Sequence, residues 1–264
     1  MCTDCGCGER PDHEHLDHQH LDHQHSHDDD VQPHRHEHEP TDRTLHVRQR
    51  ILRHNDDLAA ELRERFARHG VFVVNVVSSP GSGKTELLQR TMVELQPEVR
   101  VAALTGDLAT ENDATRLATA GAPVRQILTG TMCHLEADMV TEALSDWDLD
   151  EVDLLFIENV GNMVCPSGFD LGEDLRVMLV STTEGEDKPL KYPTLTMSAD
   201  VAIISKLDLA APVECDVELL RSNLDEIRPG IDVLATSART GAGLAPWLDL
   251  LRSAVVSKAA TPVG

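Results

Sequence analysis

The stretch VFVVNVVSSPGSGKTELL, residues 71–88, joins a run of β-branched residues to a glycine-rich turn and to the start of a helical pattern. The run 71–77 predicts a buried strand, and the apolar spacing over 83–95 predicts a helix. The turn between them fits the phosphate-loop pattern G-x-x-x-x-G-K-[ST], except that Ser78 stands in the place of the first glycine. A strand before the turn and a helix after it are the context that this pattern requires.

Each residue of the turn has a chemical use in a phosphate-binding loop. The backbone amides of Gly81, Ser82, Gly83, Lys84 and Thr85 can surround phosphate oxygens at the N-terminus of the helix. The Lys84 ammonium supplies a cation, and the Thr85 hydroxyl can hold Mg²⁺. A glycine-rich turn that binds nothing is the alternative.

Strand and helix patterns alternate along the rest of the chain. This alternation predicts an α/β fold with a mostly parallel sheet and helices on both faces. A helical pattern also precedes the first strand, with apolar residues at Ile51, Leu58, Leu62 and Phe66. The further predicted strands cover 100–104, 124–128, 153–158, 201–205 and 231–235, and the further predicted helices cover 111–120, 132–144, 213–227 and 245–257.

Composition limits the kind of protein that this chain can be. The 264 residues are 41% hydrophobic and 3% aromatic, so a sizeable core must be built from aliphatic side chains. The net charge of −23 repels phosphate backbones and makes nucleic acid an improbable partner. The N-terminus carries no apolar signal segment, and no run of about 18 apolar residues occurs. We therefore expect a cytoplasmic protein without membrane contacts, whose six cysteines are free or metal-bound.

Residues 1–40 differ in composition from the rest of the chain. Ten of the 14 histidines lie here, among 11 acidic residues and only two arginines. Because so little apolar surface can be buried, we expect this leader to be disordered without metal. The sequence HLDHQ at 15–19 recurs at 20–24, which favours capacity for many metal ions over one coordination geometry. A solvated acidic spacer is the alternative.

Two later segments indicate which base the nucleotide carries. SKLD at 205–208 and SARTGAG at 237–243 resemble the base-recognition motifs of GTP-binding proteins. The Asp208 carboxylate can accept hydrogen bonds from N1–H and the exocyclic amine of guanine, whereas adenine offers a lone pair at N1. Lys206 is expected along the base, and the Ser237–Ala238 backbone at the guanine oxygen. Ser205 replaces the usual asparagine and removes an amide that normally braces this loop.

Two acidic segments lie between the phosphate loop and the base motifs. The strand LLFIE ends at Glu158, and the following Gly161 completes a pattern like the D-x-x-G switch, with glutamate in place of aspartate. We expect Glu158 to reach Mg²⁺ through water and the Gly161 amide to sense the γ-phosphate. Asp107, at the C-terminal end of a predicted strand, is the candidate for positioning Mg²⁺ or the attacking water, with a turn or helix-cap acid as the alternative. Because no glutamine follows Gly161, hydrolysis is expected to be slow.

A second metal site is indicated by GTMCHLEADMV at 130–140. We expect a helix with Thr131 as its N-cap, so that Cys133 lies in the first turn, where the helix dipole favours a thiolate. His134 is adjacent, and Cys165 follows Gly161 by four residues. Because neighbours on a helix diverge, we expect these three residues to complete a metal site with copies from a second subunit.

Taken together, the motifs resemble those of the HypB family, the nickel-incorporation GTPases of hydrogenase maturation. The resemblance covers essentially the whole chain, and its most specific segments are GTMCH and the ENVGN…CP…FDLGE stretch. It is carried by CTDCGCG (2–8), the histidine tract, SSPGSGKT, GDLATENDA (106–114), GTMCHLEA, ENVGNMVCPSGFDLGE (158–173), SKLD and SARTGAG.

The resemblance implies a P-loop GTPase of the dimerising, signal-recognition-particle-like class that delivers nickel. Its implied partners are a second copy of the chain, a small zinc-containing nickel chaperone, and the precursor of the nickel–iron hydrogenase large subunit. It implies a tight nickel site at Cys2, Cys5 and Cys7 and a weaker nickel or zinc site at Cys133, His134 and Cys165. The predicted division is a metal-binding leader (1–40), an N-terminal helix packing on the GTPase domain (41–70), and that domain itself (71–264).

The three amino-terminal thiols have more than one possible use. Soft thiolates favour late transition metals, and in a reducing compartment a disulfide framework is the weakest of the alternatives. Three thiolates with the α-amine of Cys2, exposed if Met1 is removed, would form a square-planar set suited to Ni²⁺. Zinc held by the three thiolates and a histidine remains open.

Three other functions compete with nickel delivery. One is nickel storage with a vestigial GTPase, and another is an accessory GTPase of urease assembly, against which GTMCHLEA and the amino-terminal cysteines argue. A P-loop kinase is disfavoured by SKLD and SARTGAG together.

Overall fold

In a computed structural model of the chain, the structure describes residues 42–107 and 112–260, with side chains from Gln49 onward. Residues 1–48 and 49–264 separate into two units, and the packing described below belongs to the second. The predicted metal-binding leader over 1–40 therefore lies outside the described residues.

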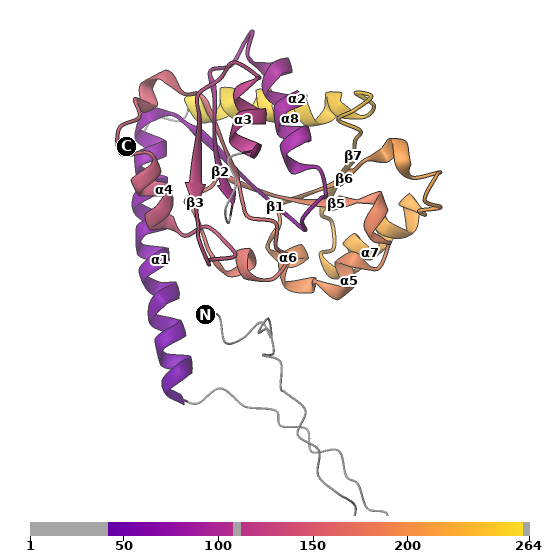
Figure 1. Ribbon diagram of the computed structural model, residues 1–264, viewed down its shortest axis with the longest axis horizontal. Coiled ribbons are helices and arrows are strands. Elements are labelled where there is room, and N and C mark those ends of the chain that lie inside the picture. Colours follow the sequence, from indigo (N-terminus) through magenta and orange to yellow (C-terminus); the bar gives the residue numbers. More distant parts are fainter. Residues whose placement is uncertain (1–41, 108–111, 261–264) are drawn as a thin grey trace, which may run out of the picture. The chain divides into compact units, whose positions relative to one another are not determined.

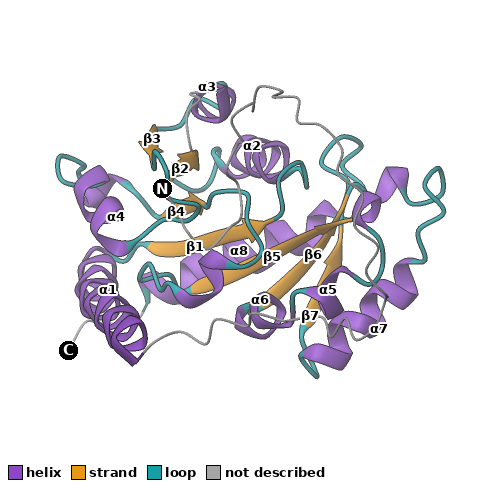
Figure 2. Ribbon diagram, turned by 60° about the horizontal axis from the view of Figure 1, so that its bottom comes forward, coloured by secondary structure: helices purple, strands orange, loops and turns teal. Residues whose placement is uncertain are grey.

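The core of the fold is one parallel sheet of seven strands in the order β3-β2-β4-β1-β5-β6-β7 (Figure 2). The predicted α/β fold with a parallel sheet is confirmed. The strands are β1 (Phe72–Ser78), β2 (Val101–Asp107), β3 (Val124–Leu128), β4 (Leu154–Glu158), β5 (Leu175–Ser181), β6 (Val201–Ser205) and β7 (Asp232–Ala235).

One strand, β5, differs from the prediction because no strand was expected there. Its run LRVMLVS carries the same apolar signal as the other strands, and all but its first residue are buried. It follows closely on the FDLGE segment (169–173), which carries part of the family resemblance. β5 pairs with β1 on one side and with β6 on the other, so it connects the two halves of the sheet.

Helices cover both faces of the sheet (Figure 1). α2, α3 and α8 pack on the face that carries Val74 and Val76 of β1, whereas α1, α4, α6 and α7 pack on the face that carries Val73 and Val77. This alternation along β1 is the period of two that an extended strand imposes. The helices are α1 (Asp42–His69), α2 (Lys84–Leu95), α3 (Asn112–Ala118), α4 (Ala137–Ala143), α5 (Lys188–Lys191), α6 (Pro193–Ser198), α7 (Val217–Ile227) and α8 (Leu244–Ala259).

The helix before the first strand contributes to the same core. Ala59, Leu62 and Phe66 of α1 are buried with residues of β1, β2 and β4, whereas the predicted stripe residue Ile51 is 48% exposed. The buried Asn55 side chain donates to the carbonyl of Asp170 (2.8 Å) and accepts from the amide of Ala137 (2.9 Å). No helix of the described part is both long and apolar enough to cross a bilayer.

Replacing Phe66 with alanine tests whether α1 stabilises the sheet as part of one folding unit. Phe66 is fully buried, so F66A is expected to lower the free energy of unfolding by about 3–5 kcal/mol. Urea denaturation followed by circular dichroism measures this loss, and the exposed Arg68→Ala on the same helix is the control, with a change within about 0.5 kcal/mol. An F66A protein as stable as the control would show that α1 is a dispensable appendage.

Candidate functional site

The phosphate loop has the geometry that its sequence predicts. β1 ends at Ser78, α2 begins at Lys84, and Gly81 and Gly83 between them adopt positive φ angles of 73° and 95°. The Ser78 hydroxyl, in the place of the first glycine, accepts from the Lys84 ammonium at 3.0 Å and lies 2.5 Å from the Ser82 hydroxyl. Ser78 therefore helps to orient the lysine, and the phosphate loop keeps its form without a glycine there.

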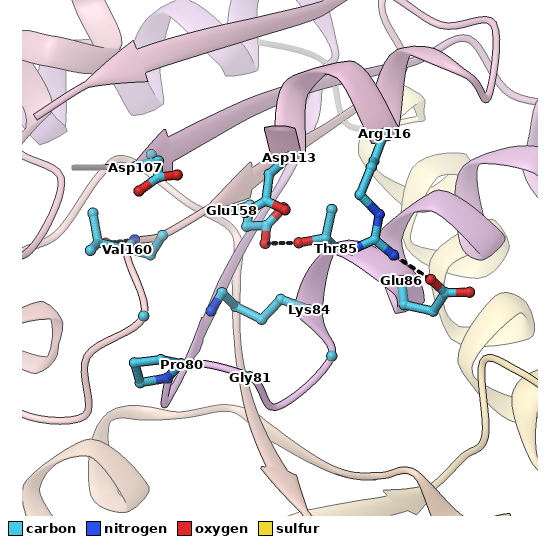
Figure 3. Close-up of a pocket in the computed structure, with 14 residues that line it drawn as sticks. Pro80, Gly81, Lys84, Thr85, Glu86, Asp107, Asp113, Arg116, Glu158 and Val160 are labelled. Atoms are coloured by element: carbon cyan, nitrogen blue, oxygen red, sulfur yellow. Dashed lines mark hydrogen bonds and ion pairs between the residues drawn. The ribbon is translucent and has the colours of Figure 1, made fainter. Parts of the chain in front are cut away.

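A cavity of about 510 Å³ opens over this loop (Figure 3). It brings together seven residues that the sequence predicted for nucleotide or Mg²⁺, whereas Ser82 lies in the loop beneath it. Its lining also includes Asp113 and Arg116 of α3, which sequence reasoning did not single out. The predicted residues at the cavity are Gly81, Gly83, Lys84, Thr85, Asp107, Glu158 and Gly161.

Glu158 is the most buried acid of this cavity, with 2% of its surface exposed. Its Oε1 accepts a hydrogen bond of 2.7 Å from the Thr85 hydroxyl, and its Oε2 is buried without a hydrogen-bond partner in the described structure. Burial raises the pKa of Glu158 to about 7, although the nearby Lys84 opposes the shift. Burial also lowers the pKa of Lys84, against the opposing field of Glu158.

These groups fit a hard divalent cation. Mg²⁺ prefers oxygen ligands and keeps several waters, and here a hydroxyl and a carboxylate with one unused oxygen lie side by side. Asp107, the last residue of β2, lines the same cavity. The residues predicted for Mg²⁺, Thr85, Asp107 and Glu158, are thus brought to one place.

Asp113 and Arg116 share one face of α3. Arg116 follows Asp113 by three residues, and its guanidinium pairs with Glu86 of α2 at 2.5 Å. The spacing of three within GDLATENDATR was the available signal, because residues at i and i+3 lie on the same side of a helix.

Gly161 lies against the phosphate loop itself. A Cβ atom at this position would come within 2.9 Å of the Pro80 Cα, so only glycine fits. The candidate switch loop and the phosphate loop are therefore in direct backbone contact.

The loop predicted for base recognition has a brace of another kind. Ser205 lacks the usual asparagine amide, as its sequence predicts, but its hydroxyl donates to the carbonyl of Ser82 at 2.7 Å. The next residue, Lys206, has a left-handed backbone (φ 55°) and reaches the carbonyl of Gly81 with its ammonium at 2.6 Å. Two side chains thus tie this loop to the phosphate loop.

The remaining residues predicted for base recognition are also brought together. The Ser237 hydroxyl donates to Asp208 Oδ1 at 2.6 Å, which fixes the carboxylate toward the SARTGAG loop. Ala238 is partly buried against the core beneath that loop. Gly243 allows the loop to turn here. Its φ of 67° is left-handed, and a Cβ at this position would overlap the carbonyl of Ala235, so only glycine fits.

The second group of predicted ligands, Cys133, His134 and Cys165, also converges. One ligand atom from each residue lies within 4.8 Å of the others, and the two sulfurs are 2.9 Å apart. Two thiolates bound to one tetrahedral ion lie about 3.8 Å apart, given the usual Zn–S distance. The two sulfurs would therefore need to move apart by only a small distance to admit an ion. Two thiolates and an imidazole would leave the fourth position of a tetrahedral ion open.

The local structure around Cys133 differs from the prediction in two respects. The helix begins at Ala137 with Glu136 as its N-cap residue, so Thr131 is not the N-cap and Cys133 precedes the helix. The amide of Leu135 bonds to the Asn159 side chain at 3.2 Å instead of joining a helical turn. Burial, with a further contribution from Cys165, raises the pKa of Cys133 to about 11, whereas a thiolate favoured by a helix dipole was expected.

The reason given for a shared site between subunits is therefore wrong. Cys133 and His134 do not diverge on a helix, and a single chain brings them to Cys165. His134 is buried, its ring stacks on Phe169 at 4.0 Å, and its Nε2 lies 3.2 Å from the Glu136 carboxylate. Such a carboxylate partner commonly orients a metal-binding imidazole. Cys2, Cys5 and Cys7 lie outside the described residues.

Comparison with known proteins agrees with this geometry. A family model described as CobW/HypB/UreG, nucleotide-binding domain, matches residues 72–235. The hydrogenase maturation factor HypB of Azotobacter vinelandii is 49% identical over 206 residues, which cover 78% of this chain and 68% of that protein. The chain belongs to the HypB family.

Two solved HypB structures resemble the described fold. HypB from Helicobacter pylori in complex with nickel is 37% identical, with a TM-score of 0.73 over 80% of this chain and 99% of that one. HypB from Archaeoglobus fulgidus is 39% identical, with a TM-score of 0.72 over 76% of this chain and 98% of that one. The P-loop GTPase fold and the resemblance drawn from the motifs are both confirmed.

The raised pKa of Glu158 gives a pH-dependent prediction. In nucleotide-free protein, one carboxyl is expected to titrate near pH 7, and Mg²⁺ with nucleotide is expected to lower that midpoint because the cation favours the ionised form. Because folding raises this pKa, the protonated Glu158 carboxyl contributes to the stability of the folded state. This contribution is complete below about pH 4.5 and is lost as the pH rises through 7. NMR of ¹³C-glutamate-labelled protein measures the midpoint. The resonance should be absent from Glu158→Gln, and a wild-type protein with no glutamate titrating above pH 6 would contradict the assignment.

Proposed function

We propose that this chain is a nickel metallochaperone that binds and hydrolyses GTP to drive nickel insertion into the large-subunit precursor of a nickel–iron hydrogenase. One observation carries the proposal. The segment from Glu158 to Cys165 belongs to both sites, because Glu158 and Gly161 line the nucleotide cavity and Cys165 lies beside Cys133 and His134. The names of its relatives, hydrogenase maturation factors and a HypB in complex with nickel, support the same function.

The nucleotide site has a proposed role for each group. Lys84 would neutralise the β- and γ-phosphates, the Thr85 hydroxyl would hold Mg²⁺, Glu158 would reach Mg²⁺ through water, and Asp107 would position Mg²⁺ or the attacking water. Bound Mg²⁺ supplies charge neutralisation on the phosphates. Within the described cavity lining no glutamine is present to orient water, so we infer slow hydrolysis that is suited to a switch.

Metal handling is proposed to occur at two places. Cys2, Cys5 and Cys7 hold nickel tightly, and Cys133, His134 and Cys165 hold nickel or zinc more weakly. The histidine tract stores nickel at many sites of modest affinity, since imidazole is mostly neutral at pH 7 and available as a ligand. The thiol of Cys133 has a raised pKa and is therefore protonated before the ion binds. Because the ion binds the thiolate, metal uptake at this site should release protons.

The proposed partners follow from the family. They are a second copy of the chain on binding of GTP or metal, a small zinc-containing nickel chaperone, and the hydrogenase precursor, all in the cytoplasm. The leader (1–40), the helix (41–70) and the GTPase domain (71–264) are the proposed functional divisions. GTP would order the 158–165 segment, and hydrolysis would loosen it and release the ion.

Base recognition can be tested by replacing Asp208 with asparagine. Xanthine carries a carbonyl where guanine carries its exocyclic amine, so D208N is expected to lose affinity for GTP by about 100-fold or more and to gain affinity for XTP. Isothermal titration with both nucleotides measures the exchange. The exposed Asp232→Asn is the matched control and should keep the wild-type preference. Unchanged GTP binding by D208N would exclude this carboxylate from base recognition.

Coupling between the two sites can be tested with nickel in a full-length chain that carries Cys2, Cys5 and Cys7 as serines. The thiolate-to-nickel absorption reports the remaining cysteines, and its loss in Cys165→Ser but not in Cys215→Ser assigns it to the internal site. We expect the nickel dissociation constant to differ by about fivefold or more between Mg²⁺·GDP and a non-hydrolysable GTP analogue. Identical constants would rule out nucleotide-driven delivery.

A further inference from the structure

Two asparagines flank the glycine that contacts the phosphate loop. Asn159 and Asn162 stand on either side of Gly161 in the sequence ENVGN, and each makes hydrogen bonds to segments far away in the chain. Neither side chain is among the proposed ligands of the metal site, and neither has a role in the proposed function.

Asn162 bonds to both cysteine segments with one carboxamide. Its Nδ2 donates to the carbonyl of Cys133 at 3.3 Å, and its Oδ1 accepts from the amides of Val164 at 2.8 Å and of Cys165 at 3.4 Å. Cys133 and Cys165 are 32 residues apart in the sequence, yet this amide holds their backbones next to one another. The separation of the two sulfurs therefore depends on the position of Asn162.

Asn159 is a fixed point on the other side of Gly161. It is 1% exposed, and its Nδ2 donates to Asn75 of β1 at 3.3 Å. Asn75 is fully buried and donates in turn to Glu173 at 3.0 Å, which is paired with Arg176 of β5. This buried chain of polar side chains anchors Asn159 to the centre of the sheet.

Gly161 lies between the anchored residue and the one that bonds both cysteine segments. Its backbone touches Pro80 so closely that a Cβ would approach the Pro80 Cα to 2.9 Å. A phosphate group that displaces Gly161 must also displace Asn162, because Asn159 is held in place by the core. Asn162 would carry that displacement to the backbones of Cys133 and Cys165.

We propose that Asn162 is a positioning residue of the internal metal site, which sets the distance between Cys133 and Cys165 and transmits the state of the nucleotide to them. This inference rests on the proposed function, since it assumes that the two cysteines bind an ion.

The test uses Asn162→Ala in the full-length chain with Cys2, Cys5 and Cys7 as serines, with Ni²⁺ alone as the probe. With Mg²⁺·GDP bound, the internal site should bind nickel about tenfold more weakly than in the parent, as removal of an outer-shell partner does. The difference in nickel affinity between the GDP form and the GTP-analogue form should also fall to less than twofold. Affinity for the guanine nucleotides and the melting temperature should stay close to those of the parent.

Two further variants separate positioning from local stability. Ser167→Ala removes a hydroxyl that donates to the carbonyl of Val164 in the same segment but has no recorded bond to Cys133, so it should leave nickel affinity unchanged. Asn162→Ser can keep the turn at Val164 but cannot reach Cys133, so it should weaken nickel binding as alanine does, and it replaces N162A if that variant does not fold.

The outcomes separate this inference from the proposed function. Nickel binding by N162A and N162S that equals the parent's overturns the role of Asn162, whatever the nucleotide does. If the nickel affinity of the parent is the same with both nucleotides, nucleotide-driven delivery and the transmitting role of Asn162 are both overturned. In that case the nickel affinity of N162A tests only whether Asn162 positions the two cysteines.

Discussion

The parallel pairing of β1 with β4 is the constraint on which both sites depend. Their register places Val76 beside Glu158, so the phosphate loop and the candidate switch loop leave the sheet as neighbours at the same edge. Parallel strands have their carboxyl ends on one side of the sheet, and the crevice there is where ligands of open α/β sheets bind. The contact of Gly161 with Pro80 and the bond from Thr85 to Glu158 both follow from that adjacency.

The nucleotide site was largely predictable because its chemistry is local. The phosphate loop needs a strand, a few consecutive amides and a helix, and VFVVNVVSSPGSGKTELL contains all three in order. The ends of the predicted strands also located Asp107 and Glu158, since strand ends meet at one edge. Arg116 was not predictable in this way, because its importance comes from a pairing with Glu86 on another helix.

The surroundings of the soft ligands were harder to predict. The apolar spacing after Thr131 indicated a helix, but the Leu135 amide bonds to Asn159, 24 residues after Leu135 in the chain, and the residues before Ala137 stay out of α4. A side chain that competes for a backbone amide from another loop leaves no trace in local periodicity. The same holds for Ser205, whose brace to Ser82 spans 123 residues and could not be read from the motif in which it stands.

The place of α1 in the core has a practical consequence for anyone who wishes to shorten this protein. Ala59, Leu62 and Phe66 close one side of the sheet, and Asn55 ties the helix to Ala137 and Asp170, which follow the two cysteine segments in the chain. Removal of the histidine leader as far as residue 40 would leave every one of these contacts in place. A truncation beyond Asn55 would remove its two bonds, and one that continued through Phe66 would expose the apolar side chains of β1, β2 and β4 and would invite aggregation. Experiments on the isolated GTPase should therefore begin upstream of Asn55.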